Sequence, residues 1–327
     1  MWWFLKRLGL VALCVGCGLW VGNSSVLIGP SDQNSPRIIA HRGVHHIYVG
    51  SDRSAESCHA APVAPITHDF IENTMPSIQE AFRLGADVVE LDVHLTRDDV
   101  FAVIHDWTVD CRTDGQGITH EQAFADLLTL DLGYRIDDGN GTFPLRGHGI
   151  GLMPNLEEVL NADIAGQILI NFKSRRSEDG IALANLLEAT QQHARVFGVY
   201  GGQEPTQTAI DLVPDLRGFD RASLKACLVP YLAFGWTGHV PAACQNTIIV
   251  VPQNYAPYLW GWPHRFTRRL GRAGTNVILV GPSDGSGFIS GIDDAEALNN
   301  VPAHFDGYIW TDRIELIGPR LSAGHKT

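Results

Sequence analysis

The chain has 327 residues, of which 45% are hydrophobic and 18% charged, and its formal net charge is −12. This acidic balance, without any Lys/Arg-rich run, argues against a nucleic-acid partner, because phosphate backbones are bound by concentrated positive charge. The length fits two domains or one α/β barrel of about 250 residues with insertions, and the hydrophobic content supplies a large core in either case.

Residues 1–22 have the pattern of a targeting segment. Lys6 and Arg7 form a short basic flank, and the run 8–22 is uncharged, apolar and of signal-peptide length. A buried first helix is the alternative, which the basic flank disfavours. We expect residues 1–22 to be a signal peptide or a signal anchor, with the body exported to the periplasm or the cell exterior. If the segment is uncleaved, residues 8–22 contact the membrane; residues 23–36 are a predicted linker.

Four of the six cysteines lie in the body of the chain. An even number in an exported protein permits two disulfides, with three possible pairings. We favour Cys58–Cys111 and Cys227–Cys244, because each pair falls in loops that can share one end of a barrel. Four unpaired cysteines, some of them buried as small apolar residues, are the alternative.

The first predicted strand, 37–40, ends in His41 and Arg42. The irregular stretch 44–71 that follows contains prolines and histidines and is too long for an ordinary connection between a strand and a helix. We therefore expect a functional loop or lid after the first strand.

Two carboxylates lie on one face of the next predicted strand. Residues 88–95 are largely apolar but include Glu90 and Asp92, which the period of 2 in a strand places on the same side. Two buried negative charges so close together repel each other and lose their hydration, so a cation or a ligand is expected between them. Carboxylate oxygens suit Mg²⁺ or Ca²⁺ better than zinc.

A histidine follows the strand after that. Residues 100–104 are apolar, are joined to the previous strand by the polar turn 96–99, and deliver His105 at their end. Because imidazole titrates near neutral pH, His105 is an acid/base candidate beside the predicted cation site.

Strand and helix patterns alternate through the rest of the chain. Further strands are predicted at 167–173, 195–199, 247–251, 276–280 and 307–311. Helices are predicted at 75–84, 119–130, from 155 onward, and at 178–193, 221–228, 260–273 and 293–298. Eight strands separated mostly by helices predict an irregular (β/α)8 TIM barrel over residues 37–320, with a long loop insertion after its first strand.

The barrel explains where the polar residues fall. TIM barrels build their active sites at the carboxyl ends of the strands. The residues predicted at or near such ends are His41, Arg42, Glu90, Asp92, His105, Asn171, Lys173 and Asp312.

The motifs in hand resemble the glycerophosphodiester phosphodiesterase family, a group of barrel phosphodiesterases similar to phosphatidylinositol-specific phospholipase C. They are HRG at 41–43, ENT at 72–74, ELDVHLTRDD at 90–99 and HD at 105–106, followed by RTDGQG at 112–117, PNLEEVL at 154–160 and YIWTD at 308–312. Their order and spacing extend the resemblance over the whole chain after the linker.

The resemblance implies a catalytic site of two histidines and two phosphate-binding cations. His41 and His105 match the paired acid/base histidines of the family. Arg42 matches its phosphate-contacting arginine, and Lys173 a lysine that holds the substrate phosphate.

The resemblance also implies a divalent cation, Mg²⁺ or Ca²⁺, bound by Glu90 and Asp92. Glu72 matches a residue that helps to order the metal and phosphate region. The family usually has a third metal-binding carboxylate in a Glu-x-Lys motif, where this chain has Asn171. An amide oxygen still coordinates a hard cation but carries no charge, so we expect weaker metal binding.

The expected function is metal-dependent hydrolysis of a glycerophosphodiester to an alcohol and glycerol 3-phosphate by histidine acid/base catalysis. The substrate is a small glycerophosphodiester or a lysophospholipid. One alternative is a lipid-directed phosphodiesterase that resembles lysophospholipase D or sphingomyelinase D. Another is a non-catalytic phosphate-binding barrel, which the presence of Asn171 favours and the pair of histidines disfavours.

Overall fold

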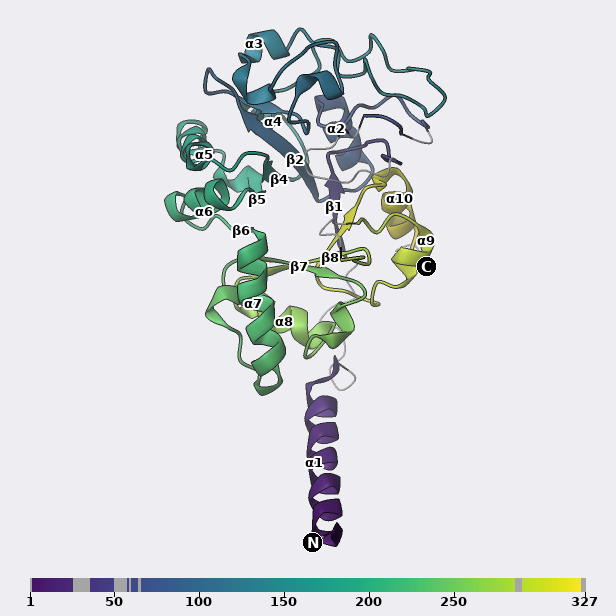
Figure 1. Cartoon of the computed structure of the whole chain (residues 1–327), viewed down its shortest axis with the longest axis vertical. Helices are drawn as coiled ribbons and strands as arrows, with labels where there is room; N and C mark the ends of the chain where they lie inside the picture. Colours follow the sequence, from purple (N-terminus) through teal and green to yellow (C-terminus); the bar gives the residue numbers. More distant parts are fainter. Residues whose placement is uncertain are drawn as a thin grey trace. The chain divides into compact units, whose positions relative to one another are not determined.

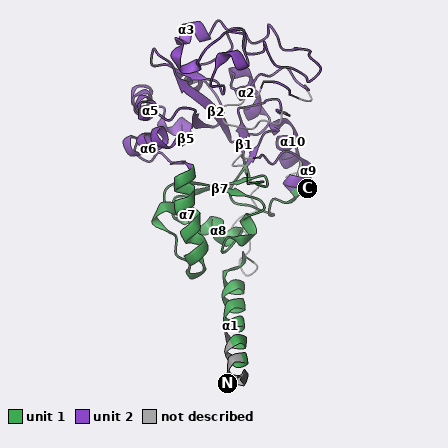
Figure 2. Ribbon diagram, in the orientation of Figure 1, with its two compact units in different colours: residues 1–37, 221–289, 299–309 green, residues 38–220, 290–298, 310–327 purple. Residues whose placement is uncertain are grey.

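The computed structural model of the chain describes residues 2–25, 36–49, 58, 60–63, 66–285 and 290–324. Most of the predicted linker, 23–36, lies outside the described residues. The chain forms two compact units, shown in different colours in Figure 2. The smaller unit comprises Met1–Arg37, Arg221–Ile289 and Asn299–Ile309, and the larger comprises Ile38–Asp220, Ser290–Leu298 and Trp310–Thr327. The predicted site residues all belong to the larger unit. The predicted bounds of the leader, the linker and the barrel stay predictions.

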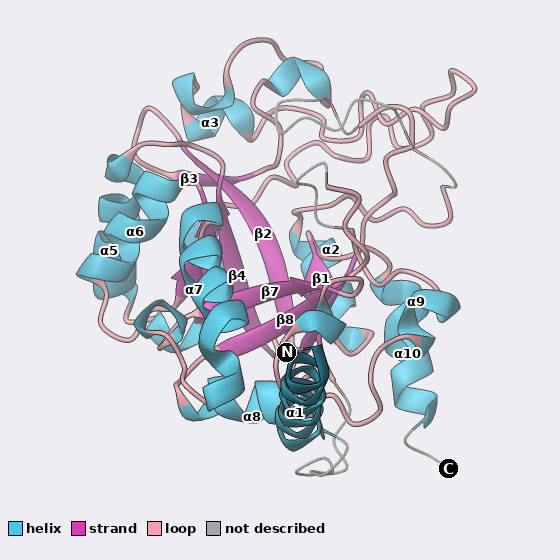
Figure 3. Ribbon diagram, turned by 60° about the horizontal axis from the view of Figure 1, so that its bottom comes forward, coloured by secondary structure: helices cyan, strands magenta, loops and turns pink. Residues whose placement is uncertain are grey.

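Strands and helices alternate in the larger unit (Figure 1). Its strands are β1 (Arg37–His41), β2 (Val88–Leu95), β3 (Phe101–Val103), β4 (Gln167–Phe172), β5 (Val196–Gly201) and β6 (Gly218–Phe219). Its helices are α2 (Met75–Arg83), α3 (Phe124–Leu127), α4 (Leu156–Asn161), α5 (Ser177–Thr190), α6 (Gln203–Leu212), α9 (Ala295–Asn299) and α10 (Ile314–Gly324). Figure 3 shows β2 beside β4. α5 contacts β2, and α6 contacts β5 and β6.

The smaller unit contains the remaining elements. These are α1 (Trp2–Asn23), α7 (Arg221–Phe234), α8 (His264–Arg272), β7 (Ile248–Pro252), β8 (Asn276–Val280) and the first half of β9 (Tyr308–Thr311). The side chain of Asn23 ties the end of α1 to this unit, donating to the carbonyl of Trp236 at 2.7 Å and accepting from Arg269 at 2.8 Å. Among the helices of the described residues, none combines the length and apolar character that a membrane crossing requires.

Each new parallel strand is added beside the one before it. In the larger unit the parallel pairs are β1–β2, β2–β4, β4–β5 and β5–β6. In the smaller unit they are β7–β8 and β8–β9. A doubly wound sheet reverses its order partway, whereas a (β/α)8 barrel does not. The predicted α/β fold of the TIM-barrel type is therefore confirmed.

The strand register aligns the polar residues at one end of the larger unit. His41 lies opposite Glu90, Asp92 opposite Asn171, and Asn171 opposite Tyr200. All eight residues of β2 are buried, which is typical of a parallel strand covered on both faces. Its charged residues are therefore isolated from solvent.

The prediction that 100–104 is a barrel strand was wrong. β3 lies off the path of parallel strands and runs antiparallel to β2, with Val93 opposite Val103. The turn at 96–99 is too short for the crossover that a parallel pair needs, so the chain forms a hairpin. The strand missing from the prediction is β6, whose two residues give no detectable apolar pattern.

Several predicted helices also differ from the observed ones. The predicted helix 119–130 is a 3₁₀ turn at Thr119–Glu121 followed by the short α3, and the predicted helix 260–273 is helical only in α8. α6 was not predicted, because its sequence QEPTQTAIDL is mostly polar. The insertion after the first strand is present, since β1 ends at His41 and α2 begins at Met75.

Both favoured disulfides are confirmed. Cys58 is bonded to Cys111 in the larger unit, and Cys227 to Cys244 in the smaller one. The cysteines of α1, Cys14 and Cys17, are exposed thiols.

Replacing Cys227 and Cys244 by serine is expected to lower the free energy of unfolding by roughly 3 kcal/mol, because a cross-link over 17 residues restricts the unfolded chain. Urea unfolding measures the change. The matched control, Cys14→Ser with Cys17→Ser, should unfold like the parent chain. Equal stability of the two double variants would contradict a stabilising cross-link.

Candidate active site

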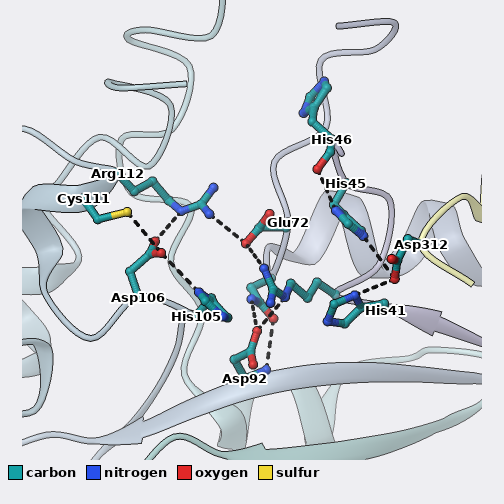
Figure 4. A network of polar contacts seen from close by, with 12 residues as sticks. His41, His45, His46, Glu72, Asp92, His105, Asp106, Cys111, Arg112 and Asp312 are labelled. Carbon is teal, nitrogen blue, oxygen red and sulfur yellow. Dashed lines mark hydrogen bonds and ion pairs between the residues drawn. The ribbon is translucent and has the colours of Figure 1, made fainter. Parts of the chain in front are cut away.

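Asp92 is the most heavily contacted side chain of the site, and Figure 4 shows it among its partners. One carboxylate oxygen lies 3.0 Å from Nε of Arg42 and accepts from Nδ2 of Asn73 at 3.1 Å. The other accepts from Nδ2 of Asn171 at 2.9 Å and lies 3.6 Å from Nζ of Lys173. Burial alone would raise the pKa of Asp92, but Arg42 and Lys173 hold it well below its usual range. Asp92 is therefore a permanent buried anion.

Glu90, two residues earlier on the same face, has a different environment. One of its oxygens accepts from the hydroxyl of Tyr200 at 2.6 Å. The other accepts from the backbone N–H of Arg42 at 3.3 Å and lies 3.7 Å from Nε2 of His41. Burial and the neighbouring charge of Asp92 raise the pKa of Glu90 to about 7. The two carboxylates thus resist being ionised together.

The residues present fit a divalent cation in part. Glu90 and Asp92 are fully buried hard-oxygen donors, and a cation would relieve the repulsion that raises the pKa of Glu90. Asn171 is placed differently from a ligand, since its amide N–H donates to Asp92. The amide oxygen of Asn171 faces Gly201 instead, and a Cβ added at that glycine would lie 2.5 Å from this oxygen. Coordination by Asn171 therefore requires its amide to turn over.

His41 ends β1 and is oriented by a carboxylate from the far end of the chain. Its Nδ1 lies 2.7 Å from an oxygen of Asp312, so this nitrogen carries a proton and donates it. Burial and Arg42 lower the pKa of His41, but Asp312 and Glu90 outweigh them and raise it above its ordinary value. His41 therefore holds a proton more readily than a free histidine.

His105 has the opposite tendency. Its Nδ1 lies 3.2 Å from an oxygen of Asp106, which orients the ring. Burial, Arg42 and Lys173 lower the pKa of His105 to about 3, although Asp106 acts in the other direction. The imidazole is therefore neutral at pH 7 and able to accept a proton.

Glu72 connects the surroundings of the two histidines. Its carboxylate accepts from Arg42 at 3.1 Å and from Arg112 at 2.7 Å, and Arg112 in turn donates to Asp106 at 2.7 Å. Burial would raise the pKa of Glu72, yet the two arginines lower it to about 2. A chain of alternating buried charges thus runs from Asp92 to Asp106, which contacts the neutral ring of His105 (Figure 4).

The backbone is unusual where β1 leads into this network. Arg42 and Asn73 have left-handed φ values of 56° and 59°, and the N–H of Asn73 donates to the carbonyl of Arg42 at 3.0 Å. Gly43 follows with φ 80°, and an added Cβ there would lie 2.2 Å from Oγ of Ser77. The turn after His41 therefore requires glycine, and non-glycine residues in this region are held by their surroundings.

The structure brings the predicted site residues together. These are His41, Arg42, Glu72, Glu90, Asp92, His105, Asn171 and Lys173, all of which take part in the contacts described above.

Sequence reasoning did not assign a role to several partners. Asn73 and Arg112 lie inside the quoted motifs ENT and RTDGQG, which was a usable signal. Tyr200 lies at the end of β5, where the strand-end argument applied to it as well. Asp312 was predicted at a strand end and Asp106 lies in the HD motif, but nothing local indicated which histidine each would contact.

Known proteins resemble this chain over the same region. The sequence model of the Glycerophosphoryl diester phosphodiesterase family matches residues 41–200. A glycerophosphodiester phosphodiesterase from Caldanaerobacter subterraneus is 42% identical over 67 residues, which are 20% of this chain and 28% of that protein. One from Bacillus subtilis is 36% identical over 93 residues, which are 28% of this chain and 31% of that protein. The aligned segments thus span less than a third of these relatives.

A solved structure has the same fold over most of its length. It is the glycerophosphodiester phosphodiesterase of Agrobacterium tumefaciens, with a TM-score of 0.56 and 22% identity, and the match covers 87% of this chain and all of the other. A phosphodiesterase from Oleispira antarctica, solved with the product sn-glycerol-3-phosphate, has a TM-score of 0.53 and 17% identity over 89% of this chain and 97% of its own.

Asp312→Asn is expected to lower the pKa of His41. The amide keeps the shape of the side chain but removes the charge that favours the imidazolium. Arg42, Glu90 and His45 also face this ring, and Arg42 then lowers its pKa further. The His41 titration, followed by NMR, should move to lower pH.

Asp126→Asn is the matched control, because Asp126 is exposed in α3, pairs with Arg97 and lies outside the charge network of the site. It should leave the titration of His41 in place. An unchanged His41 titration in Asp312→Asn would show that Asp312 does not stabilise the charged ring.

Proposed function

This chain belongs to the glycerophosphodiester phosphodiesterase family, and on that premise we propose that it hydrolyses a glycerophosphodiester to an alcohol and glycerol 3-phosphate. The observation that carries the proposal is the pair of histidines with opposite pKa shifts, each held by its own aspartate: His41 by Asp312 and His105 by Asp106. The product in the Oleispira antarctica complex, sn-glycerol-3-phosphate, supports this substrate class.

The opposite pKa shifts support a base role for His105 and an acid role for His41. His105 is neutral and removes a proton from the nucleophile, which is water or a hydroxyl of the substrate glycerol. His41 holds a proton and gives it to the oxygen of the leaving alcohol. Two environments in one site thus make one histidine a base and the other an acid, as catalysis near neutral pH needs. The negative charge of a bound phosphate raises the low pKa of His105 toward a useful value.

The phosphate needs positive charge around it. Arg42 and Lys173 supply it, and both are already held in place by Asp92. A guanidinium and an ammonium that need no reorganisation stabilise the charge that builds up in the transition state.

Glu90 and Asp92 would hold a divalent cation, Mg²⁺ or Ca²⁺, and the bound cation would supply Lewis-acid chemistry toward the phosphate. Asn171 joins these ligands if its amide turns over. With two carboxylates instead of three, the chain would bind the cation more weakly than a relative with three.

We also propose that residues 1–22 direct export. Two disulfides in the body of the chain support an oxidising compartment. N-terminal sequencing of the protein recovered from the periplasm or medium of expressing cells tests this. Retention of the whole chain in the reducing cytoplasm would contradict export.

His41→Ala and His105→Ala are each expected to reduce the rate of hydrolysis by about 10² to 10⁴-fold, the contribution of a positioned acid or base. The assay measures release of glycerol 3-phosphate from glycerophosphocholine and from lysophosphatidylcholine, with Mg²⁺, Ca²⁺ or a chelator. His148→Ala, at an exposed loop of the same unit, is the control and should keep full activity.

Each outcome separates the candidate functions. Metal-dependent turnover of glycerophosphocholine supports the proposal. Turnover of the lysophospholipid alone supports the lipid-directed alternative, and no turnover by a folded protein that binds phosphate supports the non-catalytic barrel. Near-normal rates in either alanine variant would remove that histidine from the mechanism.

Asn171→Glu is expected to tighten the binding of Mg²⁺ and Ca²⁺, because it adds a carboxylate opposite Asp92 in the strand register. Isothermal titration of the metal-free protein measures the change. Asn140→Glu, in an exposed loop, adds the same charge elsewhere and serves as the control. Equal affinity in both variants would show that position 171 does not face the cation.

A further inference from the structure

His45 is a buried histidine that the mechanism does not use. It is 6% exposed and belongs to the long segment after β1. Its Nδ1 lies 2.9 Å from the carbonyl oxygen of His46. A carbonyl only accepts, so Nδ1 carries the proton and Nε2 presents a lone pair. That Nε2 is buried and has no hydrogen-bond partner among the residues that the structure describes.

The lone pair of His45 faces another acceptor, a carboxylate oxygen of Asp312. Nε2 lies 4.0 Å from the same oxygen of Asp312 that contacts Nδ1 of His41 at 2.7 Å. The two imidazole nitrogens and the carboxylate oxygen all lie within 4.8 Å of one another (Figure 4). A buried lone pair directed at a carboxylate is costly unless a donor or a cation lies between them.

We propose that His41, His45 and Asp312 form a binding site for a transition-metal ion such as Zn²⁺, distinct from the carboxylate pair of Glu90 and Asp92. Two imidazoles and one carboxylate are a zinc donor set, whereas Mg²⁺ and Ca²⁺ prefer oxygen ligands. Metal–ligand distances of about 2.0–2.2 Å place neighbouring ligand atoms roughly 3–4 Å apart, so only small side-chain shifts are needed.

The surroundings of these ligands fit the same role. The carbonyl of His46 holds the ring of His45 by its other nitrogen, which is how metal-binding histidines are usually oriented. The indole N–H of Trp310 lies 3.3 Å from the Asp312 oxygen and fixes the carboxylate. The three ligands come from β1, the segment after it, and the residue after β9, so the folded chain is needed to assemble them.

The consequence rests on the proposed function. An ion on Nδ1 of His41 takes the place of the proton that this nitrogen now donates to Asp312, so His41 no longer changes between imidazolium and neutral imidazole during the reaction. Bound Zn²⁺ therefore inhibits hydrolysis, while Mg²⁺ or Ca²⁺ supports it. The long segment after β1 makes the enzyme sensitive to this ion through His45.

The first test is metal binding to the full chain with Co²⁺ as a spectroscopic probe, in the presence of saturating Mg²⁺. We expect one Co²⁺ per chain with a visible absorption band, displaced by Zn²⁺. His45→Gln and His45→Ala should weaken binding by at least about tenfold, since loss of even a hydrogen-bonded partner of a ligand has that effect. His46→Gln replaces a neighbouring histidine whose Nε2 contacts His68, and it should keep the band.

Glu90→Gln removes one carboxylate of the Glu90–Asp92 pair but none of the three proposed ligands. It should therefore also keep the Co²⁺ band. The second readout is inhibition by Zn²⁺, taken for each variant relative to its own rate without zinc. The His45 variants should require at least about tenfold more Zn²⁺ for half inhibition.

Binding that is absent, or equal in the parent chain and both His45 variants, would overturn the site. Because the Co²⁺ band needs no turnover, a chain that hydrolyses nothing still tests it. A band without inhibition of an active enzyme would overturn the regulatory consequence.

Discussion

The buried charge of Asp92 is the constraint on which the site depends. An ionised carboxylate without solvent costs several kcal/mol unless it is paired, and Asp92 meets that requirement with Arg42 and Lys173. Arg42 is buried as well and forms an ion pair with Glu72. Glu72 also pairs with Arg112, and Arg112 pairs with Asp106. Removing one member leaves its neighbour as an uncompensated buried charge, at a cost of about 3–5 kcal/mol. The site is therefore one electrostatic unit, and single residues within it cannot be exchanged independently.

The same charges separate the two histidines. Burial and Arg42 lower the pKa of both rings, but His41 also faces Asp312 and Glu90, and its net shift is upward. His105 faces Lys173 as well as Arg42, and its net shift is downward. One fixed arrangement of side chains thus keeps a proton on one histidine and off the other. An acid and a base for the same reaction need this difference.

The segment between β1 and α2 connects the fold to the site in two places. It carries His45, whose ring faces Asp312, and Cys58, which is bonded to Cys111. Cys111 directly precedes Arg112, and its sulfur lies 3.3 Å from an oxygen of Asp106. The cross-link therefore holds this segment against the charge network that orients His105.

The sequence by itself determined the fold class, the disulfide preference and the strand-end residues, because apolar period and residue order are local properties. The period of 2 was enough to place Glu90 and Asp92 on one face of β2. Only the tertiary structure decided that β3 turns back, and that His41 meets Asp312, 271 residues away. Such pairs depend on which strand ends converge and on rotamers set by buried charge, and neither is encoded in the spacing of residues along one strand.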